Sequence, residues 1–344
     1  MSDKLINNPL DEIKEEKVIE KPKKAPTLHK FKKSFLGKDE VSSPCLLIIA
    51  ILLLLLFKIA MNVFPDKASG YLGVLILLTI IFFIPAYLFY KFTKRGRVEK
   101  VFSELKITPP KINHIFLLFF GSIFISIIVF LVNLLFKLRT GYVDGFYLYN
   151  TFFTGKLPVP ETPLFPIVAF ALAPAICEEF MFRGIFHSSY EKQGFMAAAL
   201  TSSVMYAIIS LDVRTFISNL LLGLFLSLVL FLTKSLISCF IVNLLVKCFM
   251  LFFGTNLQSY ILSSSNRAIF FSVVIGSLLI SFAVFSFECA KIFKFSAKGK
   301  YTLPKVDTER KAEALIATKS NITSISMIIC ALLFIAFNVL TIFI

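Results

Sequence analysis

The stretch APAICEEFMFRG, residues 173–184, places two adjacent glutamates and an arginine between long apolar runs. An ionisable side chain at bilayer depth costs roughly a few kcal/mol, so such a cluster indicates a specific task. If the segment is helical, Glu179 and Arg183 lie four residues apart and can form an ion pair. Glu178 then points about 100° away from that pair. The stretch therefore predicts one carboxylate held by an arginine beside a second carboxylate that stays free.

The composition around this stretch is that of a polytopic membrane protein. Hydrophobic residues make up 57% of the 344 residues, charged residues only 17%, and the mean hydropathy is +0.82. Backbone exposed to lipid must satisfy its own hydrogen bonds, which a helix does, and a span needs about 20 apolar residues. The sequence predicts an all-α, polytopic transmembrane helix bundle of about nine spans, at 45–64, 70–90, 114–136, 164–181, 196–211, 216–233, 235–253, 268–287 and 322–344.

The net charge of +15 comes largely from basic clusters that flank the apolar runs, at 30–38, 91–100 and 291–311. With nine spans these clusters fall on one side of the bilayer, which the positive-inside rule makes cytoplasmic. We therefore expect an integral membrane protein of the plasma membrane, with a cytoplasmic N-terminus and the C-terminus outside. The clusters indicate topology and contact with anionic lipid, and no nucleic-acid partner is expected.

The chain divides into four parts by composition. Residues 1–43 are polar and charged, which predicts a disordered cytoplasmic tail and shows no cleavable signal peptide. Residues 44–113 read as an N-terminal membrane hairpin with a basic linker, 114–287 as the membrane core, and 288–344 as a basic cytoplasmic loop with a final span. The six cysteines include no CxxC pair and lie in or beside apolar runs, so we expect reduced, buried thiols.

Polar and charged side chains inside the predicted spans are concentrated in residues 164–253. Asn243 and Lys247 lie one helical turn apart and should share a face. Residues of this kind face the interior of a bundle, because exposure to lipid is costly. The candidate site residues are Glu178, Glu179, Arg183, Ser210, Asn243 and Lys247.

The motif EEFMFRG at 178–184 resembles the first motif of the CPBP family, which includes type II CAAX prenyl endopeptidases and lysostaphin-resistance and bacteriocin-immunity proteins. The resemblance extends over about 164–253. It implies a CAAX-protease-like fold for the core and an intramembrane endopeptidase that acts on membrane-associated peptides or proteins.

The other two family motifs are matched by spacing without their histidines. The second motif corresponds to Tyr206 through Ser210, with serine at the histidine position, and the third to Asn243 and Lys247, with asparagine at the histidine position. The chain has three histidines, His29, His114 and His187. A catalytic zinc site uses three ligands from His, Cys, Asp or Glu, so a set with serine and asparagine disfavours zinc, and we expect no cofactor.

Two mechanisms stay open from the sequence. In the first, Glu178 is a general base, Ser210 orients the water, and Asn243 and Lys247 donate to the oxyanion. In the second, Lys247 neutralises Glu178, and the chain is a catalytically inactive membrane scaffold or bacteriocin-immunity protein. The distances from Glu178 to Asn243 and Lys247 separate the two.

Overall fold

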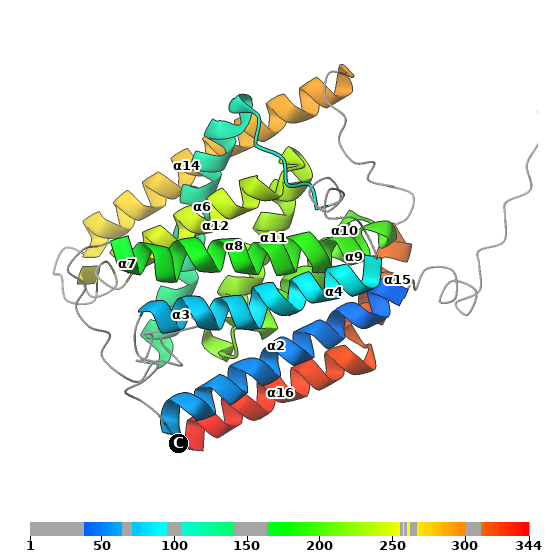
Figure 1. Ribbon diagram of the computed structural model, residues 1–344. Helices are drawn as coiled ribbons and strands as arrows, with labels where there is room; N and C mark the ends of the chain where they lie inside the picture. The colour runs from blue at the N-terminus through cyan, green and yellow to red at the C-terminus, as the bar shows by residue number, and fades with distance from the viewer. Residues whose placement is uncertain are drawn as a thin grey trace, which may run out of the picture. The chain divides into compact units, whose positions relative to one another are not determined.

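The computed structural model describes residues 38–63, 71–94, 105–140, 164–254, 257, 260–261, 267–299 and 311–343. Every regular element within these ranges is helical, which confirms the all-α prediction (Figure 1). The predicted disordered tail lies outside the described residues as far as residue 37.

The helices follow the predicted apolar segments closely. In the first part of the chain they are α2 (Lys38–Val63), α3 (Tyr71–Leu78), η1 (Thr79–Phe83), α4 (Ile84–Lys94), η2 (Ile112–His114) and α6 (Ile115–Thr140). One long helical segment then comprises α7 (Leu164–Ile167), η3 (Val168–Leu172), α8 (Ala173–Glu179), η4 (Phe180–His187), α9 (Ser188–Tyr190) and η5 (Glu191–Gln193). The remainder are α10 (Phe195–Ile208), α11 (Val213–Thr233), α12 (Leu236–Phe249), η6 (Met250–Gly254), α14 (Arg267–Ala297), α15 (Lys311–Ile322) and α16 (Ile325–Phe343).

Five of the described helices are long and apolar enough to cross a membrane, or six if the bent pair of α15 and α16 is one span. Three shorter apolar helices, Ser43–Phe57, Leu75–Lys91 and Phe195–Ile208, coincide with other predicted spans. Each predicted segment thus contains a helix, while nine as the number of crossings stays a prediction. At 14 residues, α10 rises about 21 Å, which is less than the hydrocarbon thickness of about 30 Å.

Two widened π-helical turns occur just before prolines. The η3 turn ends two residues before Pro174, and η1 ends two residues before Pro85. Proline has no backbone N–H and its ring clashes with the carbonyl four residues earlier, so the preceding turn opens. The helical segment from Leu164 to Gln193 therefore continues through the prolines with altered register. Glu178 and Glu179 follow one such turn, and a second π segment, η4, follows them.

The helices of the central block pack against one another. Helix α11 packs against α10, α12 and α6, and α12 also packs against α6 and α8. Helix α14 lies along α6, and α16 lies beside α2, as Figure 1 shows. This arrangement places α8, η4 and α12 against one another in the interior, where their polar side chains can meet.

The segment predicted as a basic loop, 288–321, is partly helical. Helix α14 continues to Ala297, ten residues beyond the predicted end of its span at 287. Helix α15 packs against α10, where Asn321 Nδ2 donates to Gln193 Oε1 (2.6 Å) and to Thr201 Oγ1 (3.3 Å). Helix α15 thus has polar partners on α10 and on η5.

Candidate functional site

Four charged side chains are buried together in the interior. Glu178, Glu179, Arg183 and Lys247 have exposed fractions of 4%, 0%, 2% and 8%. The first three lie on the helical segment Leu164–Gln193, and Lys247 lies on α12. Their formal charges balance, which matters because an unpaired charge is very costly in a medium of low polarity.

The Glu179–Arg183 ion pair has the four-residue spacing expected from the sequence. Arg183 Nε lies 3.2 Å from Glu179 Oε2, and Arg183 Nη1 donates to Glu179 Oε1 at 3.2 Å. Arg183 Nη2 donates to the carbonyl of Gly223 on α11 at 2.8 Å. The guanidinium therefore joins its own helix to α11 as well as neutralising Glu179.

Gly223 is needed where α11 approaches α10. A Cβ atom at this position would lie 2.9 Å from Ser203 Cβ and 3.0 Å from Ser203 Cα, distances that real side chains avoid. The Gly223 carbonyl also accepts a hydrogen bond from Ser227 Oγ at 3.1 Å. The glycine thus permits the close helix contact that brings its carbonyl within reach of Arg183.

Glu178 is fully engaged by donors from two other helices. Lys247 Nζ lies 3.1 Å from Oε1 and 3.0 Å from Oε2 of its carboxylate. Tyr206 OH donates to Oε2 at 3.0 Å, and Asn243 Nδ2 donates to the same oxygen at 3.4 Å. The expectation from helical spacing that this carboxylate stays free is therefore wrong, because α10 and α12 both supply donors to it.

Asn243 connects the two carboxylates. Its Nδ2 donates to Glu179 Oε1 at 2.8 Å as well as to Glu178, while its buried Oδ1 has no hydrogen-bond partner in the described part of the chain. The spacing of one turn places Asn243 and Lys247 on the same face of α12, as the sequence indicated. Both glutamates are thus held by α12 and not by their own helix alone.

The hydroxyl of Ser210 bonds to backbone carbonyls near the end of α10. Its Oγ donates to the Ala207 carbonyl at 2.7 Å and lies 3.5 Å from the Asp212 carbonyl, so it satisfies backbone at the end of α10. Tyr206, one turn earlier, is the α10 residue that reaches Glu178. Arg183 Cζ also lies 4.7 Å from the centroid of the Tyr206 ring, a cation–π contact.

The side chains at the site do not suit a zinc ion. Among the described residues, no three of His, Cys, Asp or Glu are grouped as metal ligands. The Lys247 ammonium already contacts Glu178, and Ser210 and Asn243 stand at the other two motif positions. A second cation beside that ammonium would be repelled, and hydroxyl and amide groups are weak zinc ligands. His187 lies on η4, where its ring centroid is 6.1 Å from that of Phe195.

The fold and the site together define a helical integral membrane protein with a charge-balanced cluster buried in its core. Within it, residues 160–249 match the model of the family described as Rce1-like, type II CAAX prenyl endopeptidase Rce1-like. The resemblance carried by EEFMFRG is thereby confirmed for this segment, which contains every candidate site residue. No curated protein and no solved structure matches the chain.

Sequence reasoning missed two groups of the site. Tyr206 was noticed only as the aromatic position of a motif, although a tyrosine one turn before Ser210 in an apolar helix is a candidate donor. Gly223 acts through its backbone carbonyl, which leaves no side-chain signal. A glycine in the middle of an apolar helix is a sequence feature that predicts a close contact between helices, and Gly223 could have been recognised in this way.

Proposed function

We propose that this chain is a non-hydrolytic, CAAX-protease-like membrane protein whose buried charges hold the core together as a scaffold for a membrane-associated peptide or protein. One observation carries the proposal: Lys247 Nζ lies within 3.1 Å of both oxygens of Glu178. This pairing occupies the carboxylate that the family resemblance would make the general base.

A general base needs a lone pair directed at the water that it activates. Both oxygens of Glu178 already accept hydrogen bonds, from Lys247, Tyr206 and Asn243. Removing one partner from a buried ion pair costs about 3–5 kcal/mol, a cost that would add to the barrier for hydrolysis. The pairing thus favours structural use of Glu178 over basic catalysis.

The same contacts argue against an oxyanion site. A group that stabilises an oxyanion must direct its donor at the substrate oxygen before reaction. Lys247 donates to Glu178, and Asn243 donates to both glutamates. These donors are consumed by internal carboxylates, which supports a role in joining helices.

A CAAX-type endopeptidase is the second candidate. The observation that favours it is the meeting of Glu178 with both motif positions of α12 inside the Rce1-like segment. If Lys247 moved from Glu178 to a substrate carbonyl, one step would free the base and supply an oxyanion donor. Within the scaffold proposal, a bacteriocin-immunity role is the family function that needs no hydrolysis.

Cleavage of membrane peptides separates the two candidates. Purified protein in lipid nanodiscs would be incubated with fluorogenic peptides, with and without a C-terminal prenylcysteine, beside a Glu178→Gln variant shown to be folded by size-exclusion chromatography. We expect the same background rate for both proteins, since neither hydrolyses the peptide. Cleavage by the wild-type protein that folded Glu178→Gln lacks would overturn the proposal.

A further inference from the structure

Two lysines near one end of the helices have a backbone conformation that is unusual for lysine. Lys106 has φ 55° and Lys234 has φ 54°, both in the left-handed region that favours glycine. Their segments are joined, because the Leu236 N–H donates to the Lys106 carbonyl at 2.9 Å and Thr108 Oγ1 lies 3.5 Å from the Lys234 carbonyl. Lys234 is the C-cap of α11, where its backbone N–H donates to the Leu230 carbonyl at 2.8 Å.

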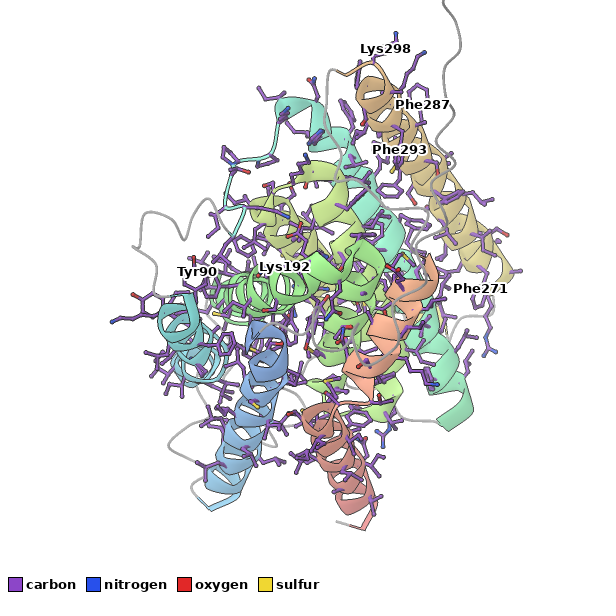
Figure 2. All side chains as sticks on the ribbon, turned by 90° about the vertical axis from the view of Figure 1, so that its right-hand side faces the viewer. Tyr90, Lys192, Phe271, Phe287, Phe293 and Lys298 are labelled. Carbon is purple, nitrogen blue, oxygen red and sulfur yellow. The ribbon has the colours of Figure 1, made fainter. Side chains whose placement is uncertain are left out.

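Two further lysines belong to the same place. Lys106 forms an ion pair with Glu191 of η5, which brings the neighbouring Lys192, exposed and labelled in Figure 2, to this end of the bundle. Lys111 is exposed three residues after Thr108, whose carbonyl accepts a hydrogen bond from Ser235 Oγ. We call Lys106, Lys111, Lys192 and Lys234 the lysine site; in the described segments 105–114, 188–196 and 231–238 the one acidic residue is Glu191.

The lysine site lies where apolar helices begin and end. Helix α11 ends at Thr233 and α12 begins at Leu236, and both helices are apolar and long enough to cross a membrane. Lys234 therefore occupies the turn between two candidate spans, at the depth of lipid headgroups.

Exposed apolar side chains adjoin the lysine site on α6 and its first turn. Ile112 is 82% exposed, Ile115 55% and Phe116 62%, directly after Lys111 in the chain. A soluble anion would make no use of such a surface, whereas acyl chains cover it. Lysines next to apolar side chains suit an anionic phospholipid, whose headgroup is negatively charged and whose acyl chains are apolar.

We propose that the lysine site binds the phosphate of an anionic phospholipid headgroup, with the acyl chains against Ile112, Ile115 and Phe116. Lysine binds phosphate as a compact point charge, and several lysines at the interface attract anionic lipid. This inference does not depend on the proposed function, since none of its residues contacts Glu178 or Lys247 in the hydrogen bonds described above.

Native mass spectrometry of lipid retained from an equimolar mixture of phosphatidylglycerol and phosphatidylcholine tests the proposal. The variant Lys192→Gln/Lys234→Gln keeps the Lys106–Glu191 pair intact. The matched control Lys294→Gln/Lys298→Gln removes the same charge from two exposed lysines at the end of α14, where Figure 2 labels Lys298. We expect wild-type protein and the control to prefer phosphatidylglycerol on the order of tenfold, and the first variant to lose most of that preference.

Three results would overturn the proposal. The wild-type protein could show no preference, the control could lose as much as the lysine-site variant, or inorganic phosphate could bind in phosphatidylcholine nanodiscs with the same lysine dependence. The last result would assign the site to soluble phosphate.

A Lys234→Gly variant tests whether misfolding explains the loss of lipid preference. Glycine adopts φ 54° without strain, so this variant should melt at a higher temperature and still lose lipid preference. A higher melting temperature with unchanged preference would contradict the role given to the Lys234 side chain.

Discussion

The segments Leu164–Gln193 and Arg267–Ala297 are nearly equal in length, at 30 and 31 residues, and both pass the same test for a membrane span. Of the most apolar window in each, 56% is buried in the first and 11% in the second. The first carries Glu178, Glu179 and Arg183 in its middle, while the two lysines of the second, Lys291 and Lys294, lie near its C-terminal end. Of the two segments, the more buried one carries the charges in its middle and is also the less apolar, with a mean hydropathy of 1.7 against 2.5.

The physical reason lies in where each side chain can be satisfied. A charge in the middle of a span needs protein partners, so its helix must be surrounded by helices that supply donors and acceptors. An apolar side chain on α14, such as Phe287 with 61% exposure, needs none because lipid is an equally good neighbour. Substitutions in the two segments should therefore have very different effects.

The largest effect is expected for Arg183→Ala. The substitution leaves Glu179, which is fully buried, without its counter-charge and removes the bond to the Gly223 carbonyl. We expect a loss of about 3–5 kcal/mol in unfolding free energy, measured by titration with sodium dodecyl sulfate in mixed micelles.

The control for this prediction is Glu179→Gln/Arg183→Met, which removes both charges and keeps the volume. It should recover a large part of the lost stability. Equal losses in the single and double variants would show that the size of Arg183, and not its charge, matters.

A smaller effect is expected for Gly223→Ala. The new methyl group would meet Ser203 at 2.9 Å, so α10 and α11 must separate. We expect a loss of about 1–3 kcal/mol in the same titration, from overpacking. Gly276→Ala on α14, where an added Cβ meets nothing within 4 Å, is the matched control and should not destabilise the protein.

The smallest effect is expected on α14. Phe293 is 50% exposed, so Phe293→Ala should change the unfolding free energy by no more than about 0.5 kcal/mol. The equivalent truncation of Phe182, which is buried on η4, should cost about 3–5 kcal/mol. Similar losses for the two phenylalanines would remove the contrast between the segments.

Much of the fold could be read from the sequence because hydropathy and backbone hydrogen bonding leave few choices in a bilayer. The helices and the Glu179–Arg183 pair followed from run length and four-residue spacing. The partners of Glu178 could not be predicted in this way. They come from α10 and α12 through tertiary packing, which residue spacing within one helix does not reveal. Ser210 was placed at the site by motif spacing, yet its hydroxyl bonds to the backbone, and Tyr206 one turn away makes the contact.

Lys247 tests the account most directly through a double-mutant cycle with Glu178, measured as unfolding free energy in micelles. Because Lys247 is the counter-charge of a buried carboxylate, Lys247→Met should lose about 3–5 kcal/mol. Adding Glu178→Gln should restore part of it, with a coupling energy of about 1–3 kcal/mol. Additive effects of the two substitutions, or a stable Lys247→Met protein, would contradict the claim that this ion pair holds the core together.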